Sequence, residues 1–176
     1  MLLFWDFVCY SFLGFCLEVL FARVTGGRAD RKCHLILPMC PVYGLGAVLI
    51  LCLAPLTGGS PVLLFAVGAI AATVVEYGMA LWYEKILGVS FWDYSDLKGN
   101  LQGRVCLPFS VAWGVLTLGL VYWVHPRVLS FIGQIPYPVA VAVMILVFAD
   151  SVVSALILWR TGDRNCLKWY SVHPAA

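Results

Sequence analysis

The amino-acid sequence predicts an all-α fold, a polytopic membrane helix bundle of about five transmembrane helices. The first observation is composition: 62% of the 176 residues are hydrophobic and 11% are charged, whereas soluble domains are about half apolar and a quarter charged. The second is that apolar stretches near the ~20 residues needed to cross a bilayer recur along the chain. Such stretches must be helical, because an open strand cannot satisfy its backbone polar groups in lipid.

The predicted spans end at clusters of glycine, proline and charged residues. We place them at about 3–22, 35–55, 61–83, 105–124 and 137–159. The first span has no basic residue before it and continues for roughly 20 residues, so we interpret it as retained rather than as a cleavable signal peptide. Residues 1–160 are therefore expected to form one transmembrane bundle, followed by a tail at 161–176.

Lysine and arginine are distributed very unevenly between the two sides of the predicted bundle. One side holds Arg23, Arg28, Arg31, Lys32, Lys85, Lys98, Arg104, Arg160, Arg164 and Lys168. The other side holds only Arg127. Because cytoplasmic loops carry the excess of basic residues, we predict that the N-terminus is outside and the C-terminal tail is cytoplasmic.

Neither cysteines nor short motifs indicate a cofactor. The seven cysteines are odd in number and contain no CxxC pair, which argues against a disulfide framework. Cys33 and His34 are adjacent, a spacing that suits a tetrahedral zinc site poorly. No Walker A, GxSxG or HExxH sequence occurs, so the chain itself is not expected to hydrolyse ATP. We expect membrane lipids as partners and no metal, cofactor or nucleic acid.

Two spans begin with the same pattern, which indicates an internal repeat. Residues 37–44 and 107–114 share the form L-P-x-[C/S]-x-x-[Y/W]-G, and the span before each one contains a glutamate, Glu18 or Glu76. We interpret this as a weak parallel repeat of two helix pairs, with the fifth span added. Transporter folds use such repeats and place their sites at the repeat interface. The alternative is a coincidence between two helix starts that contain proline and glycine.

Glu18, Glu76 and Asp150 lie within apolar spans, all in the predicted cytoplasmic half. Even lenient scales assign a cost of about 2.5 kcal/mol or more to an ionised aspartate at mid-membrane, so such residues face the bundle interior, pair or bind protons. We therefore predict a substrate-binding or ion-binding site lined by Glu18, Tyr43, Glu76, Ser110, Trp113 and Asp150. The alternative is that each acid only hydrogen-bonds a neighbouring helix or pairs with an arginine. Asp6 lies near the outer interface, where solvation is the expected explanation.

The loop at about 86–104 mixes aromatic, acidic, amide and glycine residues. Such a segment either lies on the inner membrane surface or dips inward where protein covers its backbone. The sequence leaves both arrangements open. Its candidate gating residues are Trp92, Asp93, Tyr94, Ser95 and Asn100.

Several segments, in order, carry a resemblance to a known family. They are residues 10–14 followed by Glu18, then 40–44, Glu76-Tyr77, 92–95 with Asn100, Leu101 and Gly103, and finally 107–110 with Trp113-Gly114. Over about residues 4–155 they resemble the bacterial membrane family labelled "putative ABC-transporter type IV", although Phe15 stands where that family commonly has tryptophan. The resemblance implies a permease-like, multi-pass protein of the bacterial plasma (inner) membrane. It also implies functional weight on Glu18, Glu76, Asp93, Tyr94, Ser95, Asn100 and Ser110.

Three functions are compatible with these features. The first is a transporter or permease-like subunit whose buried acids bind a cation, a proton or a small cationic solute. Because the chain is small for a lone carrier, this function calls for a homo-oligomer or a separate ATPase subunit. The second is a membrane-embedded enzyme acting on a lipid or lipid-linked substrate, with Glu76 as base and Asp93 or Glu18 as its partner. The third is a non-catalytic lipid-binding or assembly protein. The absence of a nucleophile motif favours the first function over the second.

Overall fold

A computed structural model describes residues 1–26 and 35–167. The main helices are α1 (Leu2–Val24), α2 (Pro41–Leu53), α3 (Pro61–Trp82), α4 (Leu107–Gly119), α5 (His125–Ile132) and α6 (Tyr137–Thr161). Short helical turns extend or join them: η1 (Ala54–Thr57), η2 (Tyr83–Leu87), η3 (Leu120–Val124) and η4 (Arg164–Leu167). The strands β1 (Asn100–Leu101) and β2 (Val105–Cys106) pair as an antiparallel hairpin between α3 and α4.

Four continuous helices are long and apolar enough to cross a membrane: Leu2–Val24, Pro61–Leu87, Leu107–Ile132 and Tyr137–Thr161. The helix Pro41–Thr57 is apolar but shorter. The predicted all-α fold with about five membrane helices is therefore confirmed, and the chain is a multi-pass membrane protein.

The second span begins later than expected. Residues 35–40 are not helical, and α2 starts at Pro41. Proline restricts the residue before it to extended conformations but is tolerated in the first turn of a helix. Pro38 and Pro41 therefore keep this segment out of a helix and place the helix start at Pro41. Leu35 and Cys40 are almost completely buried, so both ends of the non-helical segment lie inside the protein.

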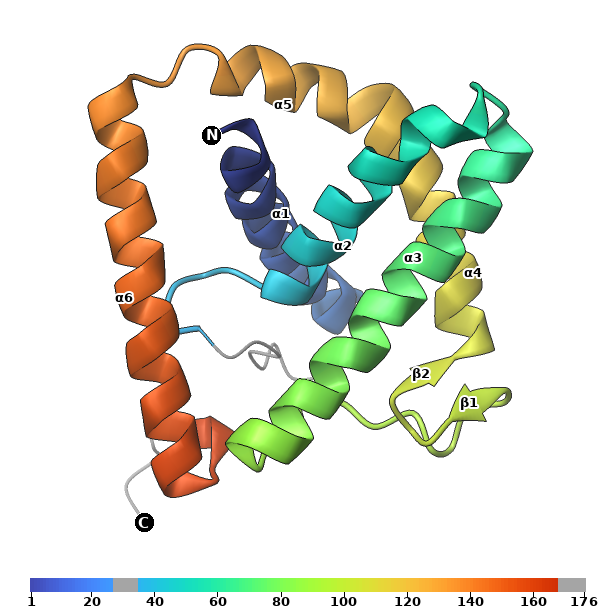
Figure 1. The fold of residues 1–176 in the computed structure, drawn as a ribbon. Helices are drawn as coiled ribbons and strands as arrows, with labels where there is room; N and C mark the ends of the chain where they lie inside the picture. The colour runs from blue at the N-terminus through green and yellow to red at the C-terminus, as the bar shows by residue number, and fades with distance from the viewer. Residues whose placement is uncertain (27–34, 168–176) are drawn as a thin grey trace.

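The fourth span continues beyond its predicted end. The π-turn η3 joins α4 to α5 without a break, and the continuous helix ends at Ile132 rather than near residue 124. Pro126 lies in the first turn of α5, where its missing N–H is tolerated. Figure 1 shows α5 running across one end of the molecule, from the top of α4 towards α6.

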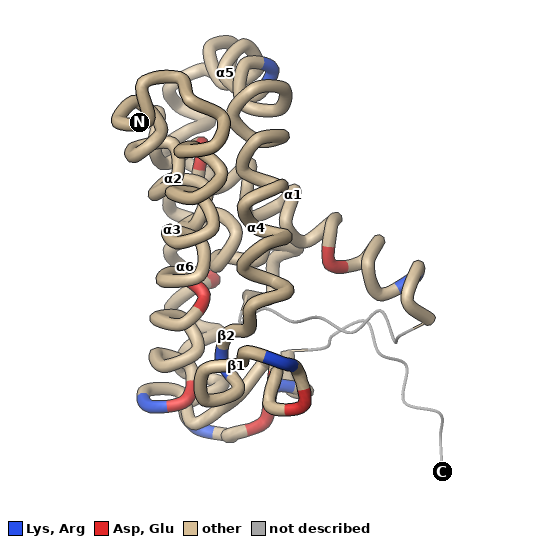
Figure 2. Tube along the Cα trace, turned by 90° about the vertical axis from the view of Figure 1, so that its right-hand side faces the viewer, with Lys and Arg blue, Asp and Glu red and all other residues tan. Residues whose placement is uncertain are grey.

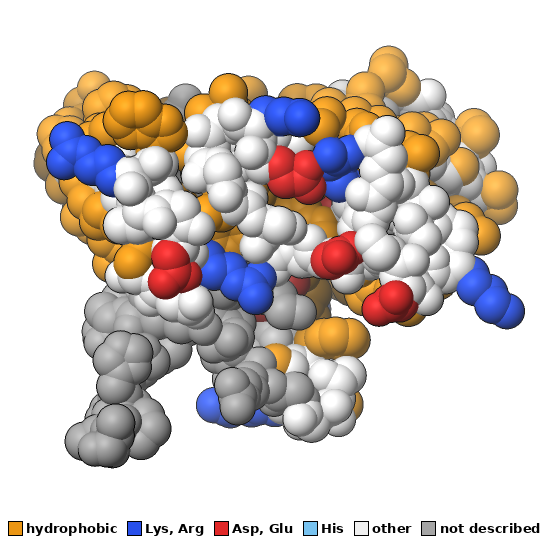
Figure 3. Space-filling view, turned by 90° about the horizontal axis from the view of Figure 1, so that it is seen from below, with side chains coloured by type: hydrophobic (Ala, Val, Ile, Leu, Met, Phe, Trp, Pro, Cys, Tyr) orange, Lys and Arg blue, Asp and Glu red, His pale blue; other side chains and the backbone are white. Residues whose placement is uncertain are grey.

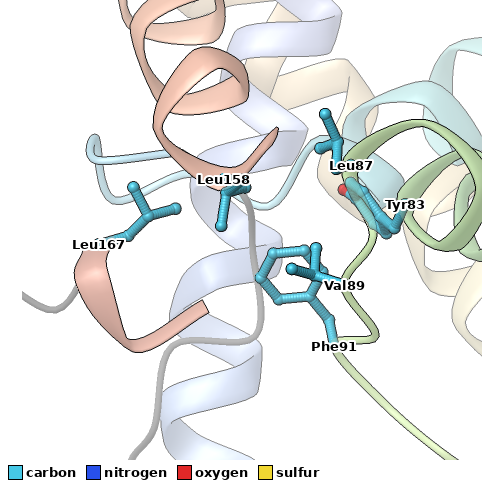
Figure 4. Packing of buried hydrophobic residues seen from close by; sticks show 6 residues of the cluster. All are labelled: Tyr83, Leu87, Val89, Phe91, Leu158 and Leu167. Carbon is cyan, nitrogen blue, oxygen red and sulfur yellow. The ribbon is translucent and has the colours of Figure 1, made fainter. Parts of the chain in front are cut away.

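Helices α1 to α4 pack against one another in chain order, while α6 stands to one side (Figure 1). Three apolar clusters join α6 to the rest. One contains Trp5, Ile132 and Ala140, at the α5 end. A second contains Leu35, Met39 and Val147. The third, at the end opposite α5, contains Tyr83, Leu87, Val89, Phe91, Leu158 and Leu167 (Figure 4).

Charged side chains gather at the end of the bundle that carries the hairpin (Figures 2 and 3). We call this the basic end; it includes Lys85, Lys98, Arg104, Arg160 and Arg164. Arg127 belongs to α5, at the opposite end. Arg28, Arg31, Lys32 and Lys168 lie outside the described residues. The asymmetry that predicts a cytoplasmic basic end is thus also present in the folded chain.

Candidate functional site

Glu76 lies at the centre of the candidate site. Glu76 belongs to α3 and is only 4% exposed, and both of its carboxylate oxygens accept a hydrogen bond. Tyr94 Oη donates to Oε1 over 3.0 Å, and Trp113 Nε1 donates to Oε2 over 2.9 Å. A buried carboxylate needs such partners, because leaving it without them costs several kcal/mol. The hairpin loop and α4 therefore both hold Glu76 in place.

Glu18 is held in a comparable way by the helix that follows it. It is half-buried on α1, and Tyr43 Oη donates to its Oε1 over 2.6 Å. Gly14 makes this approach feasible, because a Cβ there would lie 2.3 Å from Cγ of Tyr43. The small residue one turn before the acid thus admits the tyrosine ring between α1 and α2.

The two hydrogen-bonded acids are connected by their aromatic donors. The rings of Tyr43 and Trp113 meet edge to face, with centroids 5.1 Å apart. This geometry is the favourable one for aromatic pairs. Glu18, Tyr43, Trp113 and Glu76 therefore form one continuous array across α1, α2, α4 and α3, which we call the acid–aromatic array.

The helix pairs that carry this array are built alike. Tyr43 and Trp113 are the equivalent positions of the two repeat patterns, and each donates to the glutamate of the preceding span. The glycines that follow them also match. A Cβ at Gly44 would lie 2.8 Å from the Phe7 ring, and one at Gly114 would lie 2.6 Å from the Phe65 ring. Phe7 and Phe65 each lie about three helical turns before the acid of their own span. Equivalent side chains thus make equivalent contacts in both pairs.

Two cavities meet at the array. The acidic cavity has a volume of about 210 Å³, and the residues that line it alone are Glu18, Phe21, Trp92, Tyr94, Phe109 and Ala112. The apolar cavity has a volume of about 330 Å³, and the residues that line it alone include Tyr10, Leu13, Gly46, Ala47, Ile50 and Val124. Leu17, Val42, Tyr43, Glu76, Trp113 and Leu116 line both. The array therefore forms the boundary between them.

The loop between α3 and α4 closes the acidic cavity at the basic end. Tyr94 stacks on Phe109 of α4, with centroids 4.8 Å apart, and reaches Glu76 with its hydroxyl group. Trp92 Nε1 donates to the Arg104 carbonyl oxygen, and Phe91 is buried. The sequence left open whether this loop lies on the surface or dips inward. The loop lies at the basic end, and Trp92 and Tyr94, which precede the hairpin, line the acidic cavity.

Three of the predicted loop residues instead maintain the loop itself. Asp93 Oδ1 accepts from Ser95 N and Ser95 Oγ over 2.9 and 2.6 Å. These bonds stabilise the charged form and lower the pKa of the exposed Asp93 carboxyl. Asn100 donates to two loop carbonyls and accepts from Gly103 N. None of Asp93, Ser95 and Asn100 lines either cavity.

An ion pair that the sequence did not single out fastens this loop to α3. Arg104 donates through Nε and Nη2 to Glu84 Oε2 over 2.9 and 2.5 Å. The pairing raises the pKa of the Arg104 guanidinium. Arg104 also donates to Gln102, whose amide oxygen accepts from Tyr77 Oη. The only indication of this ion pair in the sequence is that an acid, Glu84, and a base, Arg104, stand at the two ends of the loop.

Two predicted site residues lie outside both cavities. Ser110 accepts from Thr73 Oγ1 over 2.8 Å and donates to the Cys106 carbonyl, so it joins α3 to α4. Asp150 accepts from the backbone N–H groups of Ile36 and Leu37 over 3.1 and 3.0 Å, and from Ser154. Asp150 therefore holds the non-helical segment 35–40 against α6 and does not join the acid–aromatic array.

Asp6 differs from the expectation of a solvated interfacial residue. It is 2% exposed, and its Oδ1 accepts no hydrogen bond from the described residues. His125 Nδ1 lies 3.7 Å from this oxygen and 2.9 Å from Tyr10 Oη. Because α5 covers the start of α1, the continuation of the fourth span buries a carboxylate that sequence position alone would leave in water.

The described residues contain no group of three His, Cys, Asp or Glu side chains that could hold a metal ion. Cys33 and His34, weighed above as zinc ligands, lie outside the described residues.

Comparison with known proteins bears on the whole bundle. No curated protein and no solved structure shows a significant match to the chain. A family model matches residues 5–157, which covers all the membrane helices except the first residues of α1 and the last residues of α6. The chain therefore belongs to the family described as "Putative ABC-transporter type IV".

Proposed function

We propose that the chain is a membrane-spanning transport subunit whose acid–aromatic array binds a cationic solute. The observation that carries this proposal is the position of Glu18 and Glu76. Two acids from equivalent helix pairs are joined through Tyr43 and Trp113 where two cavities meet. Transporter sites characteristically lie at such repeat interfaces.

The charged residues that line the cavities support a cationic ligand rather than an anionic one. Glu18 and Glu76 line the acidic cavity, and among residues 1–26 and 35–167 no lysine or arginine lines either of the two cavities. The guanidinium group of the loop, that of Arg104, is already paired with Glu84. Two carboxylates that no described base compensates favour a cationic ligand or protons in a membrane.

The aromatic lining supports an organic cation in particular. Tyr43, Trp92, Tyr94, Phe109 and Trp113 surround the acidic cavity. Aromatic faces attract ammonium groups, and the recognition of quaternary ammonium ligands by aromatic cages is the best-known use of this interaction. A metal ion would instead call for several oxygen ligands.

The loop and the array would control access. Trp92 and Tyr94 cover the acidic cavity at the basic end, and Tyr94 bonds Glu76 directly. Release of that bond would open the cavity on this side, whereas movement of Tyr43 against Trp113 would join the two cavities. This supports the loop as a gate, acting through Trp92 and Tyr94, with Asp93, Ser95 and Asn100 shaping it.

The family description supports a separate ATPase subunit as partner. We place the protein in the bacterial inner membrane, with the basic end in the cytoplasm. The alternative of a lipid-modifying enzyme receives less support, because Asp93, Asn100 and Ser110 are already engaged in bonds that maintain the loop and the α3–α4 contact. Of the two carboxylates considered as catalytic partners of Glu76 in such an enzyme, Asp93 and Glu18, only Glu18 then remains.

Binding to the purified protein tests the proposal. The chain in nanodiscs is titrated with ammonium ions from tetramethylammonium to dodecyltrimethylammonium. We expect Glu18→Gln and Glu76→Gln to weaken binding about tenfold or more, since each removes a charge that the ligand neutralises. The exposed Asp96→Asn is the matched control. If none of these cations binds, or if binding is equal in all variants, the proposed function is wrong.

A further inference from the structure

The apolar cavity provides more space than a small hydrophilic cation needs in order to bind. Gly46 lies buried on α2 and lines this cavity, yet a Cβ built there would meet no atom within 4 Å. Interiors are normally close-packed, so a buried glycine facing open space marks a volume that the protein leaves for something else. The volume of about 330 Å³ lies within the range of small-molecule sites.

The cavity extends to the membrane-facing surface between α1 and α4. Its lining residues Leu13 on α1 and Leu116 on α4 are 41% and 43% exposed. The Phe21 and Phe109 rings, with centroids 6.4 Å apart, bring the same two helices together beside the acidic cavity. A surface made of such residues on spanning helices is covered by lipid tails rather than water. A ligand could therefore enter sideways from the membrane.

Polarity changes along the two cavities in the same direction as in a lipid leaflet. Trp92 and Tyr94 of the loop at the basic end line the acidic cavity, whereas Val124, directly before α5, lines the apolar cavity. The acidic cavity thus lies on the basic side of the apolar cavity, which continues towards α5. The site therefore has the orientation of an amphiphile whose polar group is in the leaflet at the basic end.

We propose that the ligand is a single-chain amphiphile with an ammonium headgroup and no phosphate, taken from the membrane between α1 and α4. Its headgroup lies between Glu18 and Glu76, and its aliphatic chain fills the apolar cavity beside Gly46. A phosphate would meet two carboxylates in a lining to which the part of the chain that the structure describes contributes no lysine or arginine. This inference rests on the cation site of the proposed function and adds the apolar half of the ligand.

The test fills the apolar cavity without touching the acids. Gly46→Leu places a side chain in the open space, whereas Gly78→Leu is the matched control. Gly78 is an exposed residue of α3 whose Cβ would also meet nothing within 4 Å, and it lines neither cavity. Dodecyltrimethylammonium and tetramethylammonium are titrated onto both variants in nanodiscs. Binding to empty nanodiscs is subtracted at equal membrane mole fraction, and dodecyl sulfate and dodecanol are offered as competitors.

We expect Gly46→Leu to weaken dodecyltrimethylammonium binding about tenfold and to leave tetramethylammonium binding and the Gly78→Leu variant unchanged. Neither competitor should displace the cationic amphiphile. The inference is overturned, with the cation site intact, if Gly46→Leu does not affect the long chain, affects both cations equally, or if dodecyl sulfate competes. If neither cation binds the unmodified protein, the proposed function fails as well.

Discussion

Tyr43 and Trp113 meet edge to face at 76°, and each donates a hydrogen bond to the glutamate of the span before its own. One contact thus connects the two halves of an internal repeat. Through it, a displacement of Glu18 would be transmitted to Glu76, and ligand bound to one acid would be sensed at the other.

Removing the Tyr43 hydroxyl group tests whether the hydrogen bond to Glu18 is energetically significant. We expect Tyr43→Phe and Glu18→Leu to be non-additive in unfolding free energy, with a coupling of about 0.6–1.7 kcal/mol, from the average to the largest value found for hydrogen bonds between membrane helices. The measurement is a double-mutant cycle in mixed micelles. The same cycle on Tyr122 and Glu18, which do not contact each other, should be additive. Additivity in both cycles would contradict the prediction.

Gly14 and Gly46 give opposite expectations for the same substitution. Gly14→Ala places a methyl group 2.3 Å from the Tyr43 ring, and overpacking of this kind typically costs about 1–3 kcal/mol. Gly46→Ala meets open space and should leave stability unchanged or slightly higher. Thermal unfolding of the two variants, followed by circular dichroism, measures the difference. Equal melting temperatures would show that Tyr43 relaxes at no cost.

Asp150→Ala should loosen the non-helical segment before α2. The substitution removes the acceptor of the Leu37 N–H and one acceptor of the Ile36 N–H, which also donates to Ser154 Oγ, and we expect a loss of about 1–3 kcal/mol. Asp150→Asn keeps one acceptor oxygen and should have a smaller effect. In a variant whose only cysteine is the buried Cys40, maleimide labelling should be fastest for Asp150→Ala and slowest for the parent. Equal labelling rates would show that Asp150 does not hold this segment in place.

The loop between α3 and α4 should loosen only in strong acid. Ser95 lowers the pKa of Asp93 from the ordinary value of 3.8, so the folded loop binds a proton less readily than the open loop does. The stabilisation is therefore complete above pH 3.8 and is lost as the pH falls through the lower folded value. Hydrogen exchange at the Tyr94 amide, which donates to the Gly103 carbonyl, should show this change after correction for the intrinsic rate. Asp93→Asn should exchange faster at neutral pH and lose the dependence, whereas Asp96→Asn should retain it.

Asp6 and His125 should depend on each other. His125→Ala leaves the buried Asp6 carboxyl group without the imidazole that lies 3.7 Å from it, and we expect a loss of about 1–3 kcal/mol, the usual cost of leaving a buried polar group without a partner. Asp6→Asn should suppress this loss, because the amide carries no charge to be compensated. Unfolding of the single and double variants at one pH measures the effect. If the double variant is no more stable than His125→Ala, the destabilisation comes from the lost contact with Tyr10 instead.

The sequence by itself determined the features that depend on composition and short spacing. The apolar stretches specified membrane helices, the basic residues marked one end, and the L-P-x-[C/S]-x-x-[Y/W]-G patterns identified both Tyr43 and Trp113 together with their glutamates. These properties are local, since each depends on residues within one or two turns or on a count along one segment.

Tertiary structure decided which polar groups meet. Asp150 and Ile36 are separated by 114 positions, and no periodicity indicates that this acid serves a backbone segment rather than the array. The burial of Asp6 depends on how α5 lies across α1. The closure of the acidic cavity depends on where the loop before the hairpin places Tyr94. A buried polar group takes whichever partner the packed helices bring within reach. The repeat thus indicates in the sequence which two acids form a pair. The packing of the helices then brings Glu18 and Glu76 into one array, while Asp6 and Asp150 lie elsewhere.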